Sequence, residues 1–170
     1  MAKTSARIIA SLMMLASSGC ASRVVLPGAG GAEFDPIAFF SGRTHGNGEL
    51  KKLFSAPSSV SVDSVGRMEK GTLILDQTIR EGNKRPTVRR WTIRRIAHNQ
   101  YTGTLTDAVG EVRATVAGPR ADIRYTMRHG FIVEQQLVQQ SDGRTVLNRL
   151  AVHKFGAGVA TLSETIRRVD

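Results

Sequence analysis

The sequence has few of the residues that usually define a site, and each shortage excludes a class of protein. Cysteine occurs once, at Cys20, so a disulfide-stabilised scaffold is excluded. No apolar run reaches the ~20 residues that a membrane-spanning helix needs. Aromatic residues make up 5%, with two tyrosines and one tryptophan to stack on bases. We therefore expect no nucleic-acid partner, although the chain carries a formal charge of +10.

Catalytic motifs are also missing. The chain contains no Gly-x-Ser-x-Gly, no His-Glu-x-x-His, no phosphate-binding loop and no Cys-x-x-Cys. The four histidines have no metal-ligand spacing; they are His45, His98, His129 and His153. We predict no metal, no cofactor and no catalytic residue, and favour a binding protein over an enzyme.

The N-terminal residues have the three-part layout of an export signal. Lys3 and Arg7 precede the apolar run Ile8–Ala16, and this run is followed by small residues. This pattern predicts a signal peptide over residues 1–19. Cys20 directly follows Gly19, as in a bacterial lipoprotein box, where the chain is cut before a cysteine that is then acylated. The alternative is ordinary cleavage after Ala21 and release.

Lipidation at Cys20 would anchor the protein in a membrane facing the periplasm. Ala21 and Ser22, with no aspartate after the cysteine, indicate the outer membrane; a soluble periplasmic or secreted protein is the alternative. Residues 20–33 are rich in glycine and contain Pro27, which predicts a flexible linker.

Residues 34–170 read as one domain of strands. Apolar and polar residues alternate in short segments separated by Gly and Asn turns, a pattern typical of antiparallel hairpins. Connections this short leave no room for crossover helices. We predict an all-β, up-and-down barrel of about ten strands, with the segment Asp35–Gly42 capping one end. The expected strands are Thr44–Leu50, Ser59–Met68, Thr72–Arg80, Thr87–Ala97, Gln100–Thr106, Val109–Ala117, Asp122–Arg128, Phe131–Gln139, Thr145–Phe155 and Val159–Val169.

The predicted inward faces mix apolar and polar residues. The simplest interpretation is that the polar groups satisfy one another; the functional one is a partly wet pocket. An inward arginine at a strand end could bind an anionic head group. The predicted cavity wall is Trp91, Ile93, Tyr101, Leu105, Tyr125, Met127, Phe131, Val133 and Leu150. The predicted ligand-binding residues are Arg89, Trp91, Arg95, Tyr101, Tyr125, Gln135 and Asn148.

An ordered series of motifs resembles a bacterial family of exported or lipoprotein-like chains, domain of unknown function 3833. The series is Asp76, Arg90-Trp91, Tyr101-x-Gly103, Asp107-x-x-Gly110, Tyr125, Leu147-Asn148-Arg149 and Lys154-Phe155-Gly156. More distantly, Phe40-x-Gly42 before a first strand resembles the lipocalin and fatty-acid-binding (calycin) superfamily. The resemblance implies a barrel but assigns no activity.

The leading functional hypothesis is a cell-envelope protein that carries a small apolar or lipid-derived ligand in the barrel. One alternative is a cofactor-free enzyme acting on a modified lipid, with Asp107, Tyr101 or Tyr125 moving a proton. The other is a structural envelope module without a ligand. The oligomeric state does not follow from the sequence.

Overall fold

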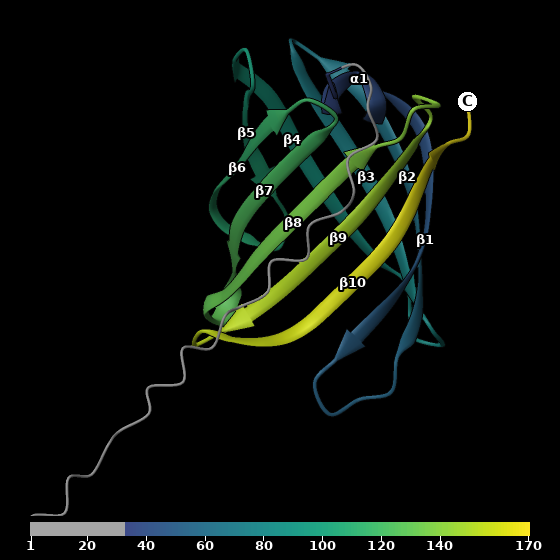
Figure 1. The fold of residues 1–170 in the computed structure, drawn as a ribbon, viewed down its shortest axis with the longest axis vertical. Helices are drawn as coiled ribbons and strands as arrows, with labels where there is room; N and C mark the ends of the chain where they lie inside the picture. The colour runs from purple at the N-terminus through teal and green to yellow at the C-terminus, as the bar shows by residue number, and fades with distance from the viewer. Residues whose placement is uncertain (1–32) are drawn as a thin grey trace, which may run out of the picture.

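Ten antiparallel strands form a closed barrel in the computed structural model, which describes residues 33–170 (Figure 1). A short helix, α1 (Pro36–Phe40), precedes the first strand, and a 3-10 turn covers Arg128–Gly130. The strands are β1 (Gly42–Lys52), β2 (Ser58–Glu69), β3 (Thr72–Glu81), β4 (Thr87–Ala97), β5 (Gln100–Leu105), β6 (Ala108–Ala117), β7 (Arg120–Met127), β8 (Phe131–Gln139), β9 (Thr145–Lys154) and β10 (Ala157–Arg168).

Each strand pairs with its neighbours in the sequence, and β1 closes the barrel by pairing with both β2 and β10. Residues Gly42–Leu50 face β2, while Thr44–Lys52 face β10. The predicted up-and-down barrel of about ten strands is therefore confirmed. The first strand is longer than predicted at both ends, because Gly42 still pairs with Gly66 of β2 and Lys52 still pairs with Ala160 of β10.

Helix α1 blocks one end of the barrel, the end at which β1 begins (Figure 1). Asp35 accepts hydrogen bonds from the backbone N–H groups of Ile37 and Ala38, and Pro36 occupies the first turn. These are standard signals for a helix start. The predicted cap at this end is confirmed, and we call it the closed end.

Three phenylalanines fasten the cap into the core. Phe34, Phe39 and Phe40 are all buried, and their rings meet edge to face at centroid distances of 5.8 and 4.9 Å. Such aromatic pairs add to the free energy of burial. A Cβ atom at Gly66 of β2 would lie 1.8 Å from the carbonyl oxygen of Phe40, so only glycine lets the cap sit this close to the wall.

The opposite end of the barrel, which we call the open end, is formed by the turns that follow β1, β3, β5, β7 and β9. No α-helix covers it in the described part of the chain, where the short 3-10 turn Arg128–Gly130 joins β7 to β8. Among residues 33–170, no helix is long and apolar enough to cross a membrane. The predicted signal peptide over residues 1–19, the lipidation site Cys20 and nearly all of the linker lie outside the described residues.

Candidate functional site

The barrel encloses a cavity of about 470 Å³. Pro36 and Phe40 of the closed end bound it on one side, and it reaches the open end at Lys84 and Arg85, which are exposed. Between them the lining is mostly apolar, including Leu75, Trp91, Ile93, Tyr101, Ala114, Ile123, Tyr125, Met127, Val133, Leu137, Leu150, Leu162 and Ile166. An apolar interior that opens at one end is suited to an apolar guest.

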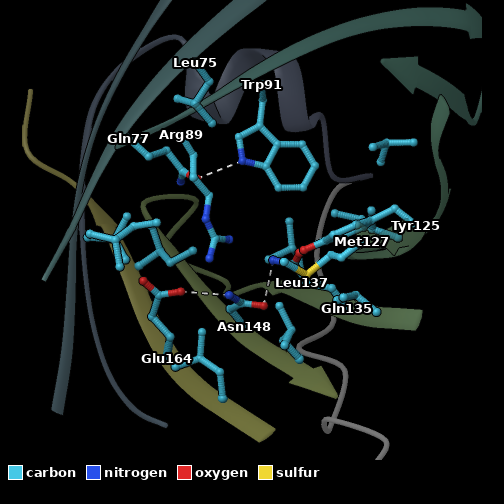
Figure 2. A pocket seen from close by; sticks show the side chains of 18 of the residues that line it. Leu75, Gln77, Arg89, Trp91, Tyr125, Met127, Gln135, Leu137, Asn148 and Glu164 are labelled. Carbon is cyan, nitrogen blue, oxygen red and sulfur yellow. Dashed lines mark hydrogen bonds between the residues drawn. The ribbon is translucent and has the colours of Figure 1, made fainter. Parts of the chain in front are cut away.

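A chain of three polar side chains crosses the wall formed by β8, β9 and β10 (Figure 2). Gln135 donates from Nε2 to Asn148 Oδ1 at 3.0 Å, and Asn148 donates from Nδ2 to Glu164 Oε2 at 2.8 Å. The simplest interpretation, that the two amides satisfy each other, is only partly correct. They share one hydrogen bond, and the chain continues from Asn148 to a buried carboxyl group.

Glu164 is the unusual member of this chain, because only 8% of it is exposed. Burial raises the pKa of its carboxyl group above the ordinary value, against the opposing effects of Asn148, His45 and Arg89. Gly46 of β1 makes room for it, since a Cβ there would lie 1.9 Å from Glu164 Oε1. The fold thus places an acid in the cavity wall where its charged form is disfavoured.

One end of the amide chain has an unused acceptor. Gln135 Oε1 is buried and has no hydrogen-bond partner in the described structure. An unpaired buried acceptor costs ~1–3 kcal/mol, so native proteins normally satisfy it with a ligand or a water molecule. Gln135 lines the cavity, so an occupant of the cavity can supply the missing donor.

Trp91 of β4 and Tyr125 of β7 form the aromatic part of the cavity lining. Their rings meet edge to face with centroids 5.6 Å apart, and Trp91 Nε1 donates to Gln77 Oε1 at 2.8 Å. Gln77 in turn donates to Ser64 Oγ at 3.1 Å. These bonds fix the indole ring, and Figure 2 shows it beside the space that the other side chains enclose.

Tyr125 is buried on the same wall, and desolvation raises the pKa of its hydroxyl to about 12. Arg89 lowers this pKa and Asp107 raises it, both by smaller amounts. Near neutral pH the hydroxyl keeps its proton. Tyr125 can therefore act as a hydrogen-bond donor rather than as a base.

Figure 2 shows the guanidinium group of Arg89 inside the cavity, where it points toward Asn148 and Glu164. Its Nε lies 3.1 Å from Asp107 Oδ2, and 30% of the side chain is exposed. The ion pair holds the Nε side of the guanidinium group near the open end of β4. Donors of Arg89 that Asp107 does not engage are available to an anionic or carbonyl oxygen.

Six of the seven predicted site residues line this cavity: Arg89, Trp91, Tyr101, Tyr125, Gln135 and Asn148. Arg95 does not. It lies at the closed end, where Nη2 donates to Asp35 Oδ2 at 2.9 Å and to the Tyr101 hydroxyl at 2.7 Å. The two arginines share a parity but stand at opposite ends of β4, and the cap covers the end that holds Arg95.

Sequence reasoning missed Glu164 and Gln77. Both carried a signal, because Glu164 shares its parity with Leu162 and Ile166, and Gln77 shares its parity with Leu75 and Ile79. A polar residue on the apolar parity of a barrel strand is a candidate for the cavity wall. No group of three or more histidine, cysteine, aspartate or glutamate side chains within residues 33–170 is arranged to hold a metal ion.

The comparisons with known proteins agree with this architecture. The family model described as "Protein of unknown function (DUF3833)" matches residues 14–168. The search of the curated proteins found no match.

Two solved structures share the fold. An S-type phycobiliprotein lyase, CPES, from Guillardia theta superimposes with a TM-score of 0.64 at 7% identity, covering 79% of this chain and 90% of that one. Rv2717c from M. tuberculosis superimposes with a TM-score of 0.62 at 14% identity, covering 81% and 99%. At such identities the similarity establishes a lipocalin-like barrel and no shared chemistry.

Proposed function

The chain belongs to the DUF3833 family of proteins of unknown function, and we propose that it binds and carries a small, mostly apolar, lipid-derived molecule inside its barrel. The observation that carries the proposal is the cavity of about 470 Å³, closed at one end and lined mainly by apolar side chains. Sites for small molecules span roughly 300–1,000 Å³ and combine such a lining with a few convergent polar groups.

The polar groups indicate how the ligand lies. Gln135 Oε1 needs a donor, while Tyr125 and Arg89 offer donors across the same space. A head group that both donates and accepts hydrogen bonds, such as a hydroxyl or an amide, satisfies all three. The apolar part then packs against Trp91 and the aliphatic side chains around it.

The N-terminal pattern supplies the location in this proposal. Export through a signal peptide over residues 1–19 and acylation of Cys20 would hold the barrel at the cell envelope, with the outer membrane favoured. There the protein would meet the lipids that the cavity is suited to hold.

The test is to purify the protein from its own membranes under native conditions and to analyse extracted lipids by mass spectrometry. We expect a stoichiometric small lipid and saturable binding of an anthroyloxy-labelled fatty acid by the delipidated protein. Absence of a co-purifying lipid together with absence of saturable binding would contradict the proposal.

A matched pair of variants tests the head-group assignment. Gln135→Leu removes the unpaired acceptor and should weaken binding of the native lipid by about tenfold, since a hydrogen bond inside a site is worth ~1–1.5 kcal/mol. Gln136→Leu alters the neighbouring residue on the opposite face of β8 and should leave binding unchanged. Equal effects of the two substitutions would contradict the assignment of Gln135 as a contact of the head group.

A further inference from the structure

Two phenylalanines at the open end are almost completely exposed. Phe54, between β1 and β2, is 97% exposed, and Phe155, between β9 and β10, is 96% exposed. Leu53 beside Phe54 is 55% exposed. We call Leu53, Phe54 and Phe155 the rim patch. Large apolar side chains held in water at turn tips contribute nothing to the core of the described structure.

The backbone at both phenylalanines is also unfavourable for this residue type. Phe54 has φ 60° and Phe155 has φ 50°, a left-handed conformation that favours glycine and asparagine. Folding stability alone would favour another residue at each position. Strained residues of this kind are concentrated at functional positions.

The two turns are neighbours, because β1 and β10 are paired. The backbone N–H of Leu53 donates to the carbonyl of Val159 at 2.9 Å, which ties the first turn to the start of β10. Both turns belong to the end at which the cavity opens (Figure 1). The rim patch therefore lies beside the mouth.

The rim around the mouth is basic. Turns and strand ends there carry Lys51, Lys52, Lys84, Arg85, Arg128 and Lys154. The acids nearby are already engaged, since Glu49 pairs with Lys51 and Glu81 pairs with both Lys52 and Lys84. Within the described residues, Arg85, Arg128 and Lys154 form no ion pair, and the Lys154 ammonium lies 4.5 Å from the centre of the Phe131 ring. The rim thus presents an excess of positive charge.

We propose that the open end docks on a lipid bilayer containing anionic phospholipid, with Phe54 and Phe155 inserted at the interface and the mouth facing the membrane. Cations attract the anionic surface, and exposed aromatic side chains partition into the head-group region. A bilayer fits better than a protein partner, because the apolar residues are separate tips on two turns rather than one continuous face. An apolar ligand could then enter the cavity without crossing water.

The experiment measures sedimentation of a chain that begins at Ala21 with lipid vesicles. Residues 33–170 contain every strand and core contact of the barrel, and such a chain carries no acyl group. Vesicles of 30% phosphatidylglycerol in phosphatidylcholine should bind it, pure phosphatidylcholine vesicles should bind it at least tenfold more weakly, and salt should release it. The readout needs no cavity ligand, so it can fail or succeed independently of the proposed carrier function.

The decisive variant is Phe54→Asn with Phe155→Asn, which should reduce vesicle binding by at least tenfold while keeping or raising thermal stability, because asparagine tolerates the left-handed conformation. The matched control, Met68→Asn with Val169→Asn, changes two half-exposed apolar residues at the closed end and should leave binding unchanged. Addition of the anionic vesicles should shift the tryptophan emission of Phe54→Trp to the blue by more than it shifts the emission of the unsubstituted chain.

Charge is tested in the same assay. Arg85→Gln with Lys154→Gln should lower affinity for the anionic vesicles by about twenty-five-fold, at roughly fivefold per cation. Arg113→Gln with Arg124→Gln, on the outer wall, should have a smaller effect. Equal losses in the two pairs, unchanged binding in the double asparagine variant, or concentration-dependent dimerisation that this variant abolishes would overturn the proposal.

Discussion

The two ends of the barrel use phenylalanine in opposite ways. At the closed end, Phe34, Phe39 and Phe40 are 1%, 3% and 6% exposed, whereas at the open end Phe54 and Phe155 are 97% and 96% exposed. Burying such a side chain contributes ~1.5–3 kcal/mol to stability, and leaving it in water forfeits that contribution. The comparison indicates that one end is built for stability and the other for contact with something outside the described chain.

Both ends carry paired and unpaired cations. At the closed end Arg95 pairs with Asp35 and Arg168 pairs with Asp170, whereas Lys70 forms no ion pair within residues 33–170. At the open end Arg85 and Arg128 form no ion pair within residues 33–170. An uncompensated basic rim contributes little to folding, but it raises the local concentration of an anionic partner.

The largest effect that separates the ends is expected from a pair of alanine substitutions. Phe39→Ala should lower the free energy of unfolding by ~3–5 kcal/mol, because it leaves a cavity in the cap. Phe54→Ala should change it by less than ~0.5 kcal/mol, because the side chain has no packing to lose. Urea denaturation measures both, and similar losses would contradict the contrast between the ends.

A smaller effect is expected from glycine substitutions at the two ends. Gly66→Ala places a methyl group against the carbonyl of Phe40, so we expect a loss of ~1–3 kcal/mol and faster quenching of Trp91 by acrylamide as the cap shifts. Gly158→Ala, near the open end, meets only a His153 atom at 3.9 Å and should change stability by less than ~0.5 kcal/mol. Unfolding curves and quenching constants provide the comparison. If Gly66→Ala leaves both unchanged, the close contact between Phe40 of the cap and Gly66 of β2 is not required.

Between the ends, Glu164→Gln should alter how stability depends on pH. Burial raises the folded-state pKa above the ordinary value of 4.5, so the native protein holds a proton that the unfolded chain releases. The free energy of unfolding therefore falls as pH rises from about 4.5 through the raised pKa.

The amide of the Glu164→Gln variant can still accept from Asn148 and carries no charge, so this pH-dependent loss should disappear. Denaturation should show that Glu164→Gln is more stable than the wild type at pH 8 but not at pH 4. Glu134→Gln, a change on β8 at a side chain that is 43% exposed, serves as the control. Parallel pH profiles for Glu164→Gln and the wild type would exclude the buried carboxyl as the cause.

The smallest effect is expected on the outer wall, at Asp76. Hydrogen bonds from Arg90, at 2.5 Å, and Arg67, at 2.7 Å, lower the pKa of Asp76 to about 2. The stabilisation is present above the ordinary pKa of 3.8 and is lost as pH falls towards 2. Since 39% of this side chain is exposed, Asp76→Asn should cost less than ~1 kcal/mol at pH 7, and less in high salt.

Much of the fold could be predicted from the sequence because alternation with a period of two is a local signal that a barrel repeats in every strand. Trp91, Tyr125 and Gln135 lie on the parity that predicted them to face inward, and all three line the cavity. The turns were predictable because they too have a local signal: Gly and Asn mark positions of positive φ.

The rest depended on contacts between distant residues. Arg95 could not be separated from Arg89 by parity alone, because only the cap on the barrel decides which end of β4 is covered. Glu164 is accommodated by Gly46, more than a hundred residues earlier, and no local pattern joins them. Phe54 lies between two expected strands and Phe155 ends another, but their almost complete exposure follows only from the turn geometry.

The most direct test of the account is a titration of the delipidated protein with an anthroyloxy-labelled fatty acid, followed by energy transfer from Trp91. The account predicts one saturable site in the wild type and in Thr115→Phe, whose substitution lies on the outer face of β6. It predicts at least a tenfold loss of affinity in Ala114→Phe, which fills the cavity from the adjacent position. Equal affinity in these two folded variants, or no transfer from Trp91 in the wild type, would contradict the claim that the interior of the barrel is the binding site.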